Sequence, residues 1–131
     1  MIVVDASAVV DVLMHERADP MLMERLRRGH LHAPHLVDVE VTHALRRLVA
    51  SGDLSSDRAS DARIDAAELT IQRYPHRPLL HRAWELRENL SVYDAVYVAL
   101  AELLEAPLVT CDARLARASG HDARIELFAP T

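Results

Sequence analysis

Residues 2–8 read Ile-Val-Val-Asp-Ala-Ser-Ala, a short apolar run that ends at an acid and passes into residues of helical composition. Such a run of β-branched residues is typical of a buried strand, and Asp is a favoured residue at the start of a helix. Residues 108–114 repeat the arrangement as Leu-Val-Thr-Cys-Asp-Ala-Arg. In an open α/β sheet, the acids Asp5 and Asp112 would lie at the carboxyl ends of their strands, where such sheets bind ligands.

The rest of the chain alternates between strand-like and helix-like patterns. Strands are expected at residues 2–4, 30–33, 70–74, 108–110 and 125–128, and helices at 6–13, 21–28, 36–50, 55–69, 79–88, 91–105 and 113–119. This alternation predicts an α/β fold with a mainly parallel sheet and helices on both faces. Gly29, Gly52 and Gly120 each follow a helical segment, where we expect left-handed caps. No glycine remains for a phosphate loop, which excludes P-loop and dinucleotide-binding motifs.

Length and composition predict one globular domain over residues 1–131. Half of the residues are hydrophobic but only 4% are aromatic, so we expect a core of Ala, Val and Leu. The single cysteine, Cys111, excludes an internal disulfide and fits a reducing compartment. The chain has no signal-peptide pattern and no uncharged run of the roughly 18 residues that a membrane helix needs. We therefore expect a soluble cytoplasmic protein without a membrane partner.

All fifteen basic residues are arginines. The absence of lysine excludes any mechanism that needs a catalytic or phosphate-binding lysine. The net charge of −5 is unusual for a protein that binds nucleic acid. Bound divalent cations would nevertheless make an acidic pocket positive, so the net charge does not identify the partner.

Four acids lie in apolar surroundings, where a lone carboxylate is costly: Asp5, Glu40, Asp94 and Asp112. Each has a purely structural alternative. Asp5 and Asp112 could cap helices, Asp94 could form a capping box with Ser91, and Glu40 could face water. Four converging carboxylates, however, would repel one another, and Mg²⁺ or Mn²⁺ would relieve that repulsion. Together the four acids favour a metal site.

Other candidate sites are weaker. His30, His32 and His35 have a spacing that could suggest zinc, but alternation along a strand together with the break at Pro34 argues against a shared site. Cys111 could be a nucleophile, although a buried thiol at a strand end fits better. Arg114 is the arginine best placed for a phosphate contact near the acids.

Two other classes of protein could also collect acids at a sheet edge. Receiver domains and haloacid-dehalogenase-like phosphatases use a lysine that this chain lacks. A non-catalytic protein whose acids bind an arginine-rich partner remains an alternative. Metal-dependent catalysis that is lost in EDTA and restored by Mg²⁺ would distinguish an enzyme from such a binding protein.

Over essentially its whole length the chain resembles the PIN-domain ribonucleases, and more narrowly the VapC toxins of bacterial toxin–antitoxin pairs. The resemblance rests on four ordered segments, which are residues 1–8, residues 33–47, residues 90–102 and residues 108–115. It implies a three-layer α/β/α sandwich, homodimerisation and inhibition by a VapB antitoxin. It also implies Mg²⁺-dependent endoribonuclease activity on structured RNA, often tRNA or rRNA.

The resemblance also implies roles for individual residues. The four acids match the family's acidic quartet, and Ser7 and Thr110 match the hydroxyl residues that support it. Asp5 and Asp94 would be the principal ligands of one Mg²⁺, for which Mn²⁺ can substitute. Asp112 and Glu40 would complete the site or hold a second ion through water.

Overall fold

The computed structural model describes residues 1–14 and 18–128 and contains a five-stranded parallel sheet of order β3-β2-β1-β4-β5. The strands are β1 (Ile2–Val4), β2 (Leu31–Pro34), β3 (Ile71–Tyr74), β4 (Leu108–Thr110) and β5 (Ile125–Leu127). β1 occupies the centre, where Val3 pairs with His32 of β2 and with Leu108 of β4. The predicted α/β class with a parallel sheet is confirmed.

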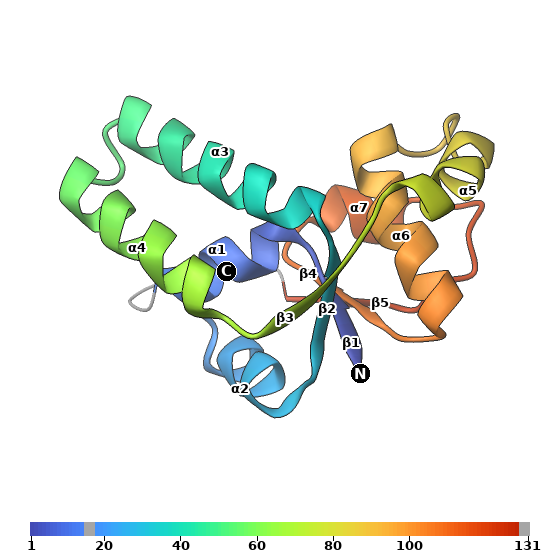
Figure 1. Cartoon of the computed structure of the whole chain (residues 1–131), viewed down its shortest axis with the longest axis horizontal. Coiled ribbons are helices and arrows are strands. Elements are labelled where there is room, and N and C mark those ends of the chain that lie inside the picture. Colours follow the sequence, from blue (N-terminus) through green and yellow to red (C-terminus); the bar gives the residue numbers. More distant parts are fainter. Residues whose placement is uncertain (15–17, 129–131) are drawn as a thin grey trace.

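Helices cover both faces of this sheet, as Figure 1 shows. Their bounds are α1 (Ala6–Leu13), α2 (Pro20–Arg28), α3 (Leu36–Ala50), α4 (Ser56–Glu68), α5 (Leu80–Glu85), α6 (Val92–Leu104) and α7 (Ala113–Arg117), with a 3₁₀ turn η1 at Arg77–Leu79. The chain first adds β2 and β3 on one side of β1 and then β4 and β5 on the other. Because parallel crossovers are right-handed, this reversal places α1, α3 and α4 on one face and α5 and α6 on the other. The result is the expected three-layer sandwich.

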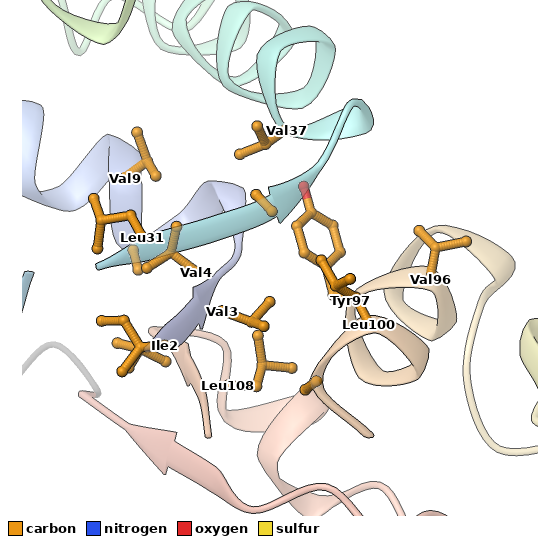
Figure 2. Packing of buried hydrophobic residues seen from close by; sticks show 14 of the residues in the cluster. Ile2, Val3, Val4, Val9, Leu31, Val37, Val96, Tyr97, Leu100 and Leu108 are labelled. Carbon is orange, nitrogen blue, oxygen red and sulfur yellow. The ribbon is translucent and has the colours of Figure 1, made fainter. Parts of the chain in front are cut away.

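The core is aliphatic and centres on β1. Ile2, Val3 and Val4 are at most 1% exposed. Figure 2 shows Val4 beside Val9 of α1, whereas Val3 lies toward α6. Alternate side chains of a strand point to opposite faces, so these few residues join both helical layers. Seven consecutive residues of α6, from Ala95 to Ala101, are also buried, so this helix is the central helix of its layer.

Among the described residues, no helix has the length and apolar character needed to cross a membrane.

Three details differ from the sequence prediction. The helix expected at 79–88 is shorter and corresponds to α5, which ends at Glu85. After Glu85 the backbone continues in turns whose hydrogen bonds join residues three apart, such as Arg87 N to Trp84 O at 3.2 Å. The helix expected at 113–119 ends at Arg117. Gly52 and Gly120 have the expected positive φ, but Gly29 has φ −85. A Cβ at Gly29 would lie 2.8 Å from Ile2 Cδ1, so Gly29 is needed for close packing rather than for a left-handed cap.

Candidate active site

The four acids predicted from the sequence line one pocket at the carboxyl edge of the sheet. Asp5 follows β1 and Asp112 follows β4, and these two strands are neighbours. The chain leaves β1 and β4 toward opposite faces, which opens a crevice at this edge. α3 brings Glu40 to the crevice from one helical layer, and α6 brings Asp94 from the other. The pocket has a volume of ≈ 500 Å³, and Asp5, Glu40, Asp94 and Asp112 all line it.

Asp5 is the most buried of the four acids, at 6% exposure. Ser7 Oγ donates to its Oδ1 at 2.7 Å, and Thr110 Oγ1 donates to its Oδ2 at 2.5 Å. The backbone amide of Ala8 donates to Oδ1 at 3.1 Å, so Asp5 is also the N-cap of α1. Asp5 therefore both caps α1 and lines the pocket.

The two hydroxyls around Asp5 are themselves oriented by the backbone that follows β4. Cys111 N donates to Ser7 Oγ and Asp112 N donates to Thr110 Oγ1, each at 3.0 Å. Because a lone pair of each hydroxyl accepts an amide proton, its single proton can point to Asp5. Ser7 lines the pocket, whereas Thr110 is fully buried behind it. Both residues thus hydrogen bond to Asp5, and the supporting role in catalysis that the resemblance implies for them stays a prediction.

Glu40 is held by a residue that the sequence prediction did not include. Tyr97 Oη donates to Glu40 Oε1 at 2.7 Å, although Tyr97 is only 1% exposed and belongs to α6. Figure 2 shows the Tyr97 hydroxyl directed out of the core toward the start of α3. Tyr97 lies three residues after Asp94, on the same face of α6, and this spacing was the available signal.

Asp94 and Asp112 are less buried and lie on helix starts. Ser91 Oγ accepts from Asp94 N at 3.1 Å at the start of α6. Asp112 caps α7 by accepting from Arg114 N at 2.9 Å and from Leu115 N at 3.4 Å. The Arg114 side chain also lines the pocket, is 82% exposed, and places its Nη2 3.7 Å from Asp112 Oδ2. Arg114 is therefore free to reach a ligand with most of its donors.

The pocket also contains three residues that the sequence analysis did not name as site candidates. Asp11 of α1 and His43 and Arg47 of α3 line it. Asp11 is four residues after Ser7, and His43 and Arg47 are three and seven residues after Glu40. Helical spacing places each of them on the same face as its neighbour in the site.

Burial and mutual repulsion make ionisation of these acids unfavourable. Burial raises the pKa of Asp5 to about 6, against the hydrogen bonds from Thr110, Ser7 and Ala8, and repulsion from Asp112 adds to the rise. The pKa of Asp94 is raised by burial and then by Asp112. Burial also raises the pKa of Glu40, although the hydrogen bond from Tyr97 opposes the shift. A bound cation would relieve all three, because it favours the ionised form.

The donor set matches a hard divalent cation held partly through water. Carboxylate and hydroxyl oxygens are the ligands that Mg²⁺ and Mn²⁺ prefer. Over residues 1–14 and 18–128, however, no three Asp, Glu, His or Cys side chains are grouped closely enough to hold one ion directly. Mg²⁺ commonly keeps several waters and uses one or two carboxylates. The pocket therefore fits an ion that one or two acids bind directly and the others contact through water.

The other sequence candidates have different surroundings. Burial raises the pKa of the Cys111 thiol to about 12, so this cysteine is protonated at neutral pH and is a poor nucleophile. His32 Nδ1 lies 2.7 Å from Tyr74 Oη. The rings of His35 and His76 meet edge to face. His76 Nε2 accepts from Leu36 N at 2.8 Å, which caps the first turn of α3.

Comparison with known proteins agrees with this architecture. The PIN domain family model matches residues 2–121. Ribonuclease VapC1 of Mycobacterium tuberculosis is 48% identical over 128 residues, which cover 95% of this chain and 96% of VapC1. Ribonuclease VapC12 of the same species is 43% identical over 129 residues, which cover 98% of this chain and 100% of VapC12. The chain therefore belongs to the PIN-domain family and, within it, to the VapC ribonucleases.

Solved structures show the same fold. PAE2754 from Pyrobaculum aerophilum has a TM-score of 0.71 and 26% identity, with 95% of this chain and 81% of that chain covered. VapBC2 from Rickettsia felis, solved bound to a DNA fragment from its promoter, has a TM-score of 0.68 and covers 98% of this chain and 99% of that chain. At 12% identity, the second likeness concerns the fold alone.

Proposed function

We propose that this VapC-type endoribonuclease is the toxin of a toxin–antitoxin pair and hydrolyses RNA phosphodiester bonds at the four-acid pocket with Mg²⁺. The observation that carries this proposal is the convergence of Asp5, Glu40, Asp94 and Asp112 on one pocket. Burial makes ionised Asp5 unfavourable, yet three donors point at its two oxygens. This arrangement suits a carboxylate whose charge is needed for a cation.

In this proposal Asp5 and Asp94 are the principal ligands of one Mg²⁺. Asp112 and Glu40 complete that site or hold a second ion through water. When bound, Mg²⁺, or Mn²⁺ in its place, polarises the scissile phosphate and lowers the pKa of an attacking water. Ser7 and Thr110 fix the orientation of the Asp5 carboxylate by the hydrogen bonds described above. Tyr97 holds Glu40 in the same way, and Arg114 offers guanidinium donors to a phosphate oxygen.

The names of similar proteins support our proposal for the substrate class and the partners. VapC20 of Mycobacterium tuberculosis, which shares the fold at 17% identity and a TM-score of 0.64, is described as a Sarcin-Ricin loop cleaving toxin. We propose structured RNA, either tRNA or rRNA, as the substrate here. We also propose a VapB-type antitoxin as partner and a homodimer as the assembly. Antitoxin binding alone does not establish the enzyme, because an arginine of the partner could occupy the same acidic pocket.

The test is digestion of total cellular RNA by antitoxin-free protein, with EDTA and with Mg²⁺ added back, followed by sequencing of the fragment ends. Wild type and Asp94→Asn are compared with Asp61→Asn, which removes the same charge from the exposed face of α4. We expect discrete Mg²⁺-dependent cuts by wild type and Asp61→Asn and none by Asp94→Asn. Folded wild-type protein that makes no cuts, or cuts equally in EDTA, would contradict the proposal.

A further inference from the structure

A second groove adjoins the acid pocket and shares two residues with it. It has a volume of ≈ 370 Å³, and Asp94 and Arg114 line both it and the pocket. The remaining lining residues are residues 87–91, between α5 and α6, and Leu115 of α7. Pockets that hold small ligands commonly measure about 300 to 1,000 Å³, so this groove could hold part of a nucleotide.

Arg87 on this groove is held in place by Trp84. Its guanidinium carbon lies 4.3 Å from the centroid of the Trp84 ring, and its Nη1 donates to Trp84 O at 2.9 Å. By contrast, Arg25, Arg73 and Arg82 each bind a carboxylate of another element at 2.8 Å or less. Within the part of the chain that the structure describes, no carboxylate is recorded within ion-pair distance of Arg87. Stacking on Trp84 orients this guanidinium and leaves most of its donors for a ligand.

The groove wall that carries Arg87 is fixed to the opposite loop. Asn89 Nδ2 donates to Ser119 O at 2.8 Å. Gly120 has φ +89, and a Cβ at this position would collide with the Asn89 amide. Asn89 and Gly120 therefore tie residues 87–91 to the chain after α7.

We propose that this groove binds the RNA nucleotide next to the scissile phosphodiester, with Arg87 and Arg114 contacting its phosphate and Trp84 acting as a positioning residue for Arg87. This inference rests on the proposed function. Planar guanidinium groups match phosphate geometry, and the groove also reaches Ser91 at the amino-terminal end of the thirteen-residue α6, where anions are favoured. Glu88 contributes a carboxylate to the groove, so the positions of the two arginines, and not the net charge of the groove, favour a phosphate there.

Continuity with the acid pocket identifies which part of the RNA the groove would hold. A strand whose scissile phosphate lies against Asp5 and Asp94 can continue past Arg114 into the groove, because Asp94 and Arg114 line both spaces. The groove lies directly beyond these two residues. The next phosphate along the strand is therefore the group that Arg87 and Arg114 can reach together.

The test is RNA binding in EDTA, where the inference does not depend on metal or on cleavage. The probe is a labelled, random-sequence single-stranded RNA of roughly 12 nucleotides, and its affinity is measured by fluorescence anisotropy at several salt concentrations. The variants are Arg87→Ala, Trp84→Ala and Arg77→Ala. Arg77 is an exposed arginine of η1 outside both spaces and is the control for a lost positive charge.

We expect Arg87→Ala to weaken binding roughly tenfold and to reduce the slope of log affinity against log salt by about 0.7, the value for one phosphate contact on a single strand. Trp84→Ala should weaken binding roughly threefold and reduce the slope in the same direction, although it changes no charge. Arg77→Ala should change affinity less than about twofold. Trp84 is the only tryptophan, so RNA should also change the intrinsic fluorescence of wild type but much less that of Arg87→Ala.

The inference is overturned if Arg87→Ala binds RNA as Arg77→Ala does, or if it loses affinity for the antitoxin while its RNA affinity is unchanged. Failure of the proposed function would be seen separately, as the absence of EDTA-sensitive cleavage by wild type. In that case an RNA-affinity loss specific to Arg87→Ala would still support the groove as an RNA-binding site.

Discussion

Replacing Asp5 with Asn removes a buried charge while it keeps the shape of the side chain and an acceptor for Ser7 and Ala8. The carboxylate is 6% exposed, and its pKa rises from 3.8 to about 6, mainly because of burial. A shift of this size corresponds to ~3 kcal/mol of folding free energy. We therefore expect metal-free Asp5→Asn to be more stable than metal-free wild type at pH 7.5, by up to ~3 kcal/mol.

The difference in stability between wild type and Asp5→Asn depends on pH. Because the folded-state pKa of Asp5 is raised, its protonation stabilises the fold; this contribution is complete below pH 3.8 and is lost as pH rises through about 6. Wild type should consequently lose stability relative to Asp5→Asn between these values, and the two proteins should converge below pH 3.8. Added Mg²⁺ should stabilise wild type, by ~2.7 kcal/mol at one hundred times its dissociation constant, and not the variant.

The assay is urea unfolding in EDTA over the pH range from 3.5 to 8, repeated with Mg²⁺. Asp61→Asn is the control, because Asp61 is exposed on α4 and its replacement should leave stability nearly unchanged. A metal-free Asp5→Asn protein that is less stable than wild type at pH 7.5 would contradict this prediction. That result would mean that Asp5 stabilises the fold as a charged helix cap rather than being retained at a cost for function.

Three further predictions follow from the hydrogen bonds and burial of the site. Tyr97→Phe removes the hydrogen-bond donor to Glu40 and so raises the pKa of that carboxyl further. Cleavage should therefore fall more at pH 6 than at pH 8, and an equal loss at both pH values would contradict a role of Tyr97 in keeping Glu40 ionised. At limiting Mg²⁺, wild-type cleavage should rise with pH through about 6 as Asp5 ionises, and more Mg²⁺ should move the midpoint of this pH profile to lower pH. A midpoint that does not depend on Mg²⁺ would argue against competition between the proton and the metal for Asp5. Gly120→Ala should destabilise the fold by at least ~1 kcal/mol in urea unfolding, because Gly120 has a positive φ and a Cβ there would collide with Asn89. Gly52 also has a positive φ but has no neighbour within 4 Å, so Gly52→Ala measures the backbone contribution alone.

Local patterns were sufficient to predict most of the fold. The helices at Ala6–Leu13 and Leu36–Ala50 and the strands at Ile2–Val4 and Leu108–Thr110 have the expected bounds. Each of these helices follows a strand and a capping or breaking residue, so its start is encoded within a few positions. The helix expected at 79–88 was too long, because the turns after Glu85 are stabilised by burial of Leu86 and Leu90, a tertiary effect.

The acids could be placed from sequence because two of them follow strands and two lie on helices beside them. Their partners were harder to find. The hydrogen bond from Tyr97 to Glu40 spans 57 positions in the chain, and the stacking of Arg87 on Trp84 depends on the turn after α5. Gly29 shows the same limit, because its role is to admit Ile2, which only the folded packing reveals.

Cleavage in our proposal requires a divalent ion held by the carboxylates of this pocket. A crystal structure of the antitoxin-free protein with Mn²⁺ would test this requirement, because anomalous scattering locates the ion at a Mn²⁺ concentration that restores cleavage after EDTA. We predict an ion in the pocket, with an oxygen of Asp5 or Asp94 among its ligands and with bound waters. An ion located elsewhere, or an empty pocket under conditions of full cleavage, would contradict that requirement.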